Sequence, residues 1–288
     1  MSITLKKLFA GFVHRNRSKT PVPPRRPLVS VIDIRGRVGA ELGMVSLESL
    51  SPNIDHAFTW PYPDAVLLRI NCNGGAPAQA EMIHRRIRSI ADLLSVPVIA
   101  SVEDAATSAG YWIALAADQI IAQESSLIGS VGTCSYQFGF EKLLARIGID
   151  RRVLATGPDK AYSDPFLPQT DHARELAASI QADIHSTFQR VVVISRGSRL
   201  CISIDAVSQG TTWSGMAAHR LGLVDEIQDV RVFLAKRFQV VPEMRIYRAA
   251  PGNEIDARAP SIGRLERAFN SFINRKLNQS LGAVFELE

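Results

Sequence analysis

The sequence predicts an α/β fold in which buried parallel strands alternate with helices. A continuous apolar run at residues 65–70, broken only by Arg69, is typical of a parallel strand that is buried on both faces. Apolar residues then recur with a helical period through 78–94, and a second apolar run follows at 97–102. A strand, a helix and a strand in this order indicate a βαβ unit.

The same alternation continues on both sides of this unit. A strand at 29–38 comes first, and glycines mark its end. After the unit we expect a helix from Ser108, a strand at 119–122, a helix at 140–147, a strand at 152–155, a helix at 172–195, a turn with a short helix within 208–224 and a last strand at 223–227.

Composition divides the 288 residues into three parts. Residues 1–27 carry seven basic side chains and no acidic one, and they end in a stiff proline-rich linker. We expect the catalytic or binding domain to span 28–240. The extension at 241–288 contains an amphipathic helix at 262–281, which packs on the core, on another subunit or on a membrane surface.

Charge and metal-ligand spacing exclude several function classes. The net charge of +5 comes from residues 1–27, so the remainder is close to neutral and shows no basic groove for nucleic acid. The three cysteines are far apart, and the six histidines have no metal-binding spacing. We therefore expect no nucleic-acid partner, no metal and no cofactor.

The first residues bear on localisation. The apolar run at 8–13 is too short to span a bilayer and is shorter than a typical signal-peptide core. We expect a cytoplasmic protein without a clear transmembrane helix or signal peptide. Residues 1–19 could contact an anionic membrane surface through one apolar helical face with basic flanks. A frayed tail is the alternative.

The stretch 104–112 contains the strongest candidate for chemistry. Here Ser108 lies between a predicted strand and a run of small residues that begins a helix. Its hydroxyl would lie at the helix N-terminus, where free N–H groups and the dipole favour a developing negative charge. Such a serine suits acyl transfer when a base can reach it. The alternative is an ordinary helix N-cap.

Three other positions complete a candidate site. No histidine forms a recognisable triad, whereas Lys160 follows a Gly-Pro turn and could act as the base if its surroundings lower its pKa. The pair Gly74–Gly75 could turn backbone N–H groups toward an oxyanion. Ser130, in a glycine-flanked turn, could hold the lysine amine. The alternatives are a solvated lysine, an ordinary turn and a serine that stabilises its turn.

Together these segments resemble the signal peptide peptidase A (SppA/SohB) family of serine peptidases. The resemblance runs in order over residues 29–227. Its five motifs are Ile-Asn-Cys-Asn-Gly-Gly at 70–75, Ala-Thr-Ser-Ala-Gly-Tyr at 106–111, Ala-Asp-Gln-Ile-Ile-Ala at 117–122 with Gly-Ser-Val-Gly-Thr at 129–133, Gly-Pro-Asp-Lys at 157–160, and a Gly-x-x-Trp-x-Gly run at 210–215 that continues to Gly-Leu-Val-Asp at 222–225.

The resemblance implies a Clp protease/crotonase-like fold of repeated ββα units and a peptidase that cleaves through an acyl-enzyme. It implies Ser108 as the nucleophile, Lys160 as the base and Ser130 as the hydroxyl that orients the lysine. It implies Gly74–Gly75 and Ala109 as parts of the oxyanion hole. It also implies a peptide substrate and, because the family assembles into rings, a homo-oligomer.

Two departures from the family pattern keep other functions open. Cys72-Asn73 replaces Ser-Pro, which removes a proline that stiffens the loop. Ala109 replaces a glycine next to the nucleophile, which adds a methyl group where we expect the backbone to be tight. An inactive scaffold that binds partners is therefore one alternative. The other is a crotonase-type enzyme acting on acyl-CoA, which the same fold implies and which would not need Ser108 or Lys160.

Overall fold

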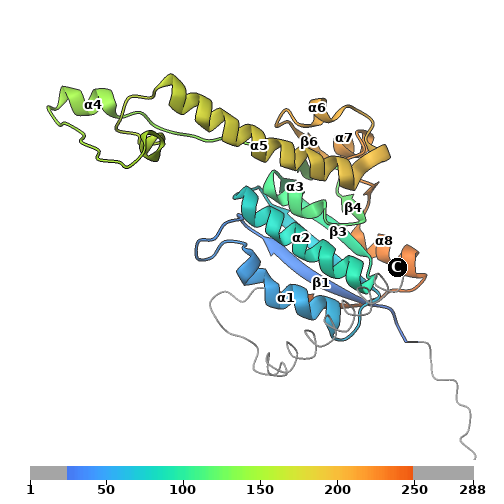
Figure 1. The fold of residues 1–288 in the computed structure, drawn as a ribbon. Helices are drawn as coiled ribbons and strands as arrows, with labels where there is room; N and C mark the ends of the chain where they lie inside the picture. Colours follow the sequence, from blue (N-terminus) through green and yellow to red (C-terminus); the bar gives the residue numbers. More distant parts are fainter. Residues whose placement is uncertain (1–24, 249–288) are drawn as a thin grey trace, which may run out of the picture.

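An eight-stranded mixed sheet forms the centre of the protein in the computed structural model, which describes residues 25–248 (Figure 1). Its main path runs in the order β6-β5-β3-β2-β1-β8, with β4 beside β3 and β7 beside β4. The strands are β1 (Leu28–Arg35), β2 (Ala65–Cys72), β3 (Val98–Thr107), β4 (Gln119–Ala122), β5 (Leu127–Gly129), β6 (Thr212–Ser214), β7 (Glu226–Ile227) and β8 (Glu243–Tyr247).

The predicted α/β class is confirmed, because β1, β2, β3 and β4 are parallel and helices connect them. The helices are α1 (Leu47–Thr59), α2 (Pro77–Leu94), α3 (Ala109–Ala114), α4 (Glu141–Arg146), α5 (Asp171–Arg196), α6 (Ile204–Val207), α7 (Gly215–Arg220) and α8 (Val230–Phe238), with 3₁₀ turns η1 (Pro158–Ala161) and η2 (Gly197–Arg199).

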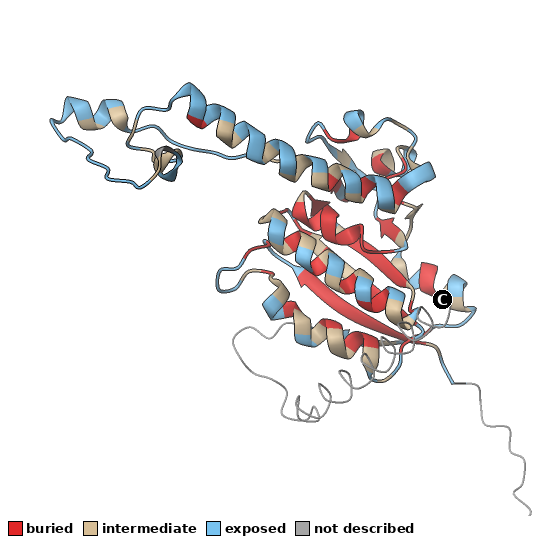
Figure 2. Cartoon of the chain, in the orientation of Figure 1, coloured by how far each residue is buried: buried red, intermediate tan, exposed pale blue. Residues whose placement is uncertain are grey.

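The alternation of side chains along β1 divides the core into two layers. Ile32 and Ile34 belong to the larger apolar cluster, which includes buried residues of α1, α2 and α3. Val29 and Val31 point to the opposite face, where Phe233 of α8 and its neighbour Leu234 cover them. Figure 2 shows the sheet and the inner faces of these helices as the buried part of the molecule.

The third strand is longer than the apolar run at 97–102 predicted. Residues 99–101 of β3 pair with β4, and residues 105–107 pair with β5. The strand therefore passes from one neighbour to the next and reaches Thr107, one residue before Ser108. This extension delivers the candidate nucleophile to the carboxyl end of the sheet.

A long arm projects from this body. It consists of α4, η1, the loops around them and the first part of α5, and most of its surface is exposed (Figures 1 and 2). The predicted helices at 140–147 and 172–195 are confirmed as α4 and α5. The predicted strand at 152–155 is wrong: the segment is irregular, and Leu154 is fully exposed because the arm offers no strand to pair with.

Several elements lie where no periodic pattern indicated them, and α1 and β8 are two of these. A capping box begins α1: Ser46 Oγ accepts from the Ser49 N–H, and the Ser46 N–H donates to Ser49 Oγ. Strand β8 pairs with β1, so the sheet continues past residue 240, the boundary expected from the sequence. The predicted helix at 262–281 and the basic residues 1–24 lie outside the described residues. Between residues 25 and 248 no helix is long and apolar enough to cross a membrane.

The packing of α2 on α3 makes stability depend on pH through His84. Burial lowers the pKa of His84 to about 4, and a hydrogen bond with the Leu115 backbone only partly opposes this. Between pH 6.5 and pH 4, His84 is protonated in the unfolded chain but neutral in the folded chain. We therefore expect the free energy of unfolding to fall by about 3 kcal/mol as the pH is lowered through this window.

The measurement is urea unfolding of the wild type and of His84→Gln at several pH values. Glutamine keeps a donor for the Leu115 carbonyl but has no charge to gain. The slope between pH 6.5 and pH 4 should therefore be smaller in the variant. Equal slopes for the two proteins would contradict the assignment.

Candidate active site

Ser108 occupies a strained turn between β3 and α3. Its φ of 52° and ψ of −121° lie where non-glycine residues are uncommon, and such strain is concentrated at functional sites. The Ser108 N–H donates to the Gly129 carbonyl at 2.8 Å, and the Ser108 carbonyl accepts from the Trp112 N–H at 2.9 Å. Its side chain makes no capping bond. Ser108 is thus the N-cap residue of α3 by position, but its hydroxyl caps no N–H group and has no hydrogen-bond partner among the described residues.

Close backbone contacts set the position of this turn. A Cβ atom on Gly110 would lie 2.4 Å from the Cys72 carbonyl oxygen, so only glycine lets α3 approach the end of β2. A Cβ atom on Gly74 would meet the Ser108 Cβ at 3.0 Å. The tight position is thus Gly110. Ala109, where the sequence predicted the conflict, has room for its methyl group and is 2% exposed in the core.

The Gly74–Gly75 loop is held by Val38, in the segment that follows β1, instead of by a proline. The Val38 N–H donates to the Gly74 carbonyl at 2.9 Å, and the Val38 carbonyl accepts from the Ala76 N–H at 2.9 Å. Both glycines have positive φ, 122° and 143°. A side chain on Gly75 would collide with the Val38 carbonyl at 1.9 Å. The loop therefore keeps a defined shape although Cys72-Asn73 stands in place of Ser-Pro.

Two backbone donors beside Ser108 have no acceptor among the described residues. Neither the Gly75 N–H nor the Ala109 N–H donates to an acceptor in the part of the chain that the structure describes. Both residues line the same cleft as Ser108. Free N–H groups next to a nucleophilic hydroxyl are the donors that a tetrahedral oxyanion requires.

A cleft of about 1150 Å³ brings most of the predicted site together. Ser108, Ser130 and the glycine loop all line it. Ser130 also has a φ of 52°. The Ser130 N–H donates to the Thr211 carbonyl at 2.7 Å, which fixes the position of this residue. Its other lining residues are Gly36, Arg37, Asn71, Asn73, Pro77, Ala109, Trp112, Gly132, Thr133, Cys134, Tyr136, Gln181, Ala182, His185, Phe188, Ser208, Gln209 and Gly210.

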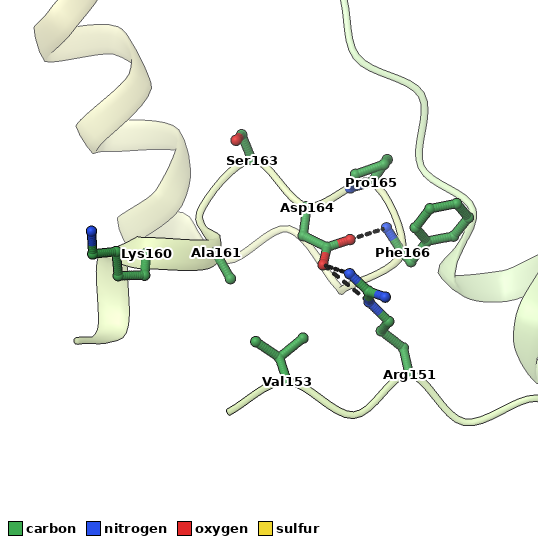
Figure 3. A pocket seen from close by; sticks show the side chains of 8 residues that line it. All are labelled: Arg151, Val153, Lys160, Ala161, Ser163, Asp164, Pro165 and Phe166. Carbon is green, nitrogen blue, oxygen red and sulfur yellow. Dashed lines mark hydrogen bonds and ion pairs between the residues drawn. The ribbon is translucent and has the colours of Figure 1, made fainter. Parts of the chain in front are cut away.

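Lys160 lies elsewhere. It is exposed on η1 in the arm and lines a separate cavity of about 430 Å³ with Arg151, Asp164 and Phe166, among others. Figure 3 shows its side chain pointing away from the Arg151–Asp164 ion pair, in which Arg151 Nη2 lies 2.8 Å from Asp164 Oδ2. The Phe166 N–H and Arg151 lower the pKa of Asp164. The structure thus does not bring Lys160 and Ser108 together within one chain.

Helix α5 contributes residues that the sequence analysis missed. Gln181, His185 and Phe188 all line the Ser108 cleft. Their spacing of i, i+4 and i+7 shows that they share a helix face, but no sequence pattern indicated that this face covers Ser108. Phe188 stacks on Trp112, with ring centroids 4.5 Å apart, and both side chains are almost fully buried. This aromatic pair forms part of the wall of the cleft that Ser108 lines.

A buried ion pair fixes the far end of α5. The fully buried Arg196 side chain donates through Nη1 and Nη2 to Asp225, both at 2.8 Å, and through Nε to the Gly222 carbonyl at 2.8 Å. Burial alone would raise the pKa of Asp225, but the bonds from Arg196 and from the Ile120 N–H lower it. The Gly-Leu-Val-Asp motif at 222–225 is therefore an anchor for α5 and not part of the cleft.

Comparison with known proteins identifies the family. The model of "Peptidase family S49" matches residues 94–239, just over half of the chain. The chain is 39% identical over 219 residues to a protein of Brucella abortus (strain 2308) named Na(+)/H(+) antiporter NhaA, covering 76% of this chain and 30% of that protein. It is 31% identical over 179 residues to Protease 4 of Haemophilus influenzae, covering 62% and 28% respectively.

A shorter relative is covered more completely. The chain is 29% identical over 234 residues to the probable protease SohB of Buchnera aphidicola subsp. Schlechtendalia chinensis, covering 81% of this chain and 74% of that protein. The predicted resemblance is thus confirmed. The chain nevertheless spans less than a third of the antiporter-named relative and of Protease 4.

Two solved structures are similar to this chain. One is a ClpP1 mutant from Listeria monocytogenes, with a TM-score of 0.46 and 18% identity over 71% of this chain and 94% of the other. The second is a mutant of the 1510-N membrane-bound stomatin-specific protease, with a TM-score of 0.47 and 16% identity over 79% and 99%.

Gly110→Ala tests the contact that positions the turn at Ser108. The new methyl group would lie 2.4 Å from the Cys72 carbonyl, so α3 or the glycine loop must shift. We expect the free energy of unfolding in urea to fall by about 1–3 kcal/mol. Gly157→Ala is the matched control, since its added Cβ has no atom within 4 Å and its φ is −149°. Equal losses in both variants would contradict this role for Gly110.

Arg196→Met tests the anchor of α5. Methionine fills similar space but leaves the Asp225 carboxylate without its main partner, and we expect a loss of about 3–5 kcal/mol in unfolding free energy. Arg199→Met is the control on the same carboxylate. Arg199 Nη1 lies 3.2 Å from Asp225 Oδ1, and the Arg199 side chain is 40% exposed. We therefore expect this variant to lose less than about 1 kcal/mol of unfolding free energy. Similar losses from the two changes would contradict the anchor.

Proposed function

Because the chain belongs to peptidase family S49, we propose that it hydrolyses peptide bonds with the Ser108 hydroxyl as the nucleophile. The observation that carries the proposal is the strained turn at Ser108, where an unpaired hydroxyl lies in a cleft together with two unpaired backbone donors. A turn of this kind is costly, and the Ser108 hydroxyl makes no capping bond to α3, so the place of the turn in the cleft supports a chemical role.

The reaction follows from these groups. Ser108 Oγ attacks the carbonyl carbon of the peptide, and a base takes the hydroxyl proton. The N–H groups of Gly75 and Ala109 stabilise the oxyanion of the tetrahedral intermediate. When the C–N bond breaks, the departing amine takes the proton from the base and the acyl group remains on Ser108. Water, deprotonated by the same base, then releases the acid.

Lys160 is the proposed base, delivered by a second copy of the chain. A lysine can accept the serine proton when burial or nearby positive charge lowers its pKa, and Lys160 is exposed on its own arm. Docking of the arm over the cleft of a neighbour would bury the amine next to Ser108, where the unpaired Ser130 hydroxyl could hold it. The proposed enzyme is accordingly a homo-oligomer.

The surface of the arm supports this arrangement. Large apolar side chains are exposed along it, with Leu154 fully exposed and Tyr136 90% exposed. A run of exposed apolar residues on a projecting element is typical of a surface that another chain covers. Others on the arm are Phe138, Leu143, Ile147, Ile149 and Val153.

The decisive experiment mixes two inactive variants. Ser108→Ala and Lys160→Ala should each lose peptide hydrolysis, because one lacks the nucleophile and the other the base. If each base serves a neighbouring nucleophile, subunits exchanged in an equal mixture should restore activity at about a quarter of the sites. An inactive mixture of oligomers that exchange subunits would contradict delivery by a second copy.

His185 is the base to exclude, since it lines the same cleft as Ser108. His185→Gln should retain at least a large part of the wild-type kcat, whereas Lys160→Ala should not. A serine-directed fluorophosphonate separates the remaining alternatives. Labelling of the wild type but not of Ser108→Ala supports the peptidase. A folded protein without labelling indicates a scaffold, and acyl-CoA binding without labelling indicates the crotonase-type reaction.

A further inference from the structure

The charges around the cleft are unbalanced. Among the described residues that line it, Arg37 is the one arginine, there is no lysine, and no aspartate or glutamate is present. The other ionisable side chains on its walls are Cys134, Tyr136 and His185. A substrate that enters the cleft therefore meets one full positive charge and no wall carboxylate.

The backbone around Arg37 is fixed against the glycine loop. The Gly36 N–H donates to the Asn71 carbonyl at 3.0 Å, and the Arg37 carbonyl accepts from the Val45 N–H at 2.9 Å. The next residue, Val38, holds the Gly74 carbonyl. The backbone of Arg37 is thus held in the segment that follows β1, next to the residue that contacts the glycine loop.

The Arg37 side chain has no partner of its own. It is exposed and makes no ion pair or side-chain hydrogen bond with any residue in 25–248. Two residues earlier, Arg35 is paired with Glu103 at 2.6 Å. Of these two neighbouring arginines, Arg35 is thus paired and Arg37 is not.

Carboxylates of β1 and β3 accept hydrogen bonds from side chains other than Arg37. The Asp33 carboxylate accepts hydrogen bonds from Arg69 Nε at 2.5 Å and from Arg69 Nη2 at 2.7 Å, and it also forms an ion pair with Arg248. Asp104 accepts from the Asn71 side chain at 2.5 Å. No carboxylate of the described residues forms an ion pair with Arg37, and this includes Glu41 in the same loop.

From this placement we propose that Arg37 is a specificity residue that binds a carboxylate of the peptide substrate. The inference rests on the proposed peptidase function. The carboxylate belongs either to an acidic side chain or to the peptide C-terminus, because the guanidinium fork binds both through the same two parallel bonds. Such a contact is present before and during reaction, so it acts mainly on KM.

The test measures binding and does not require hydrolysis. In the Ser108→Ala protein, fluorescence polarisation compares labelled ten-residue peptides that differ only by Glu or Gln at one position, each with an amidated or a free C-terminus. We expect the Glu peptide or the free-acid peptide to bind about tenfold more tightly than its neutral partner. The amidated pairs identify the side chain as the source, and the Gln pair identifies the C-terminus.

Arg37→Gln in the same background should abolish this preference while leaving the affinity for the neutral peptide unchanged. Arg37→Lys should restore part of it, since lysine supplies charge without the fork. The matched control is Arg231→Gln, which removes an exposed arginine at the start of α8 that also has no side-chain partner among the described residues. The control should keep the full preference.

Three results would overturn the inference: equal binding of charged and neutral peptides, a preference that survives Arg37→Gln, or no peptide binding at all. The proposed hydrolysis is judged separately, by fluorophosphonate labelling of the wild type. A labelled enzyme without charge preference refutes only the role of Arg37. A charge preference in a protein that does not label retains the binding site and refutes the reaction.

Discussion

The contact between the first turn of α3 and the ends of β2 and its loop is the constraint on which the site depends. Gly110 lies against the Cys72 carbonyl, and Gly74 lies against Ser108. Each approach is possible only because one partner has no side chain. Together they force Ser108 into a backbone conformation that a serine rarely adopts, and the bonds to Gly129 and Trp112 hold it there. The strain is thus balanced by packing and hydrogen bonds on both sides of the turn.

The rest of the fold supports this contact from two directions. Within the sheet, β3 changes partner from β4 to β5 and so carries the chain to the carboxyl end of the sheet, close to the glycine loop. On the helical side, α5 places Phe188 on Trp112, one helical turn after Ser108. The buried Arg196–Asp225 pair fixes α5 to the residue that immediately precedes β7. Helix α5 therefore both lines the cleft and continues into the exposed arm (Figure 1).

Sequence patterns predicted the parts of this structure that are local. The buried run at 65–70 and the periodic run at 78–94 became β2 and α2, because a fully buried strand and a long amphipathic helix each have a distinct period. The three-residue strands β5 and β6 are too short to show one. The segment 152–155 has the residue composition of a strand, but no neighbouring strand lies beside it. Strand pairing depends on segments far apart in the chain, so composition alone did not reveal this. The roles of Gly110, Arg37 and α5 depend on contacts between segments far apart in the chain.

The same distinction between local and distant contacts separates the two halves of the proposed chemistry. The nucleophile and its backbone donors come from adjacent strand ends of one sheet, so one folded chain suffices to position them. The lysine lies on an arm whose apolar side chains remain exposed in the single chain. A base that is supplied only on assembly would leave the isolated chain with a complete oxyanion site but no means of deprotonating Ser108. Association would then control activity through the burial of one amine, because burial is what lowers its pKa.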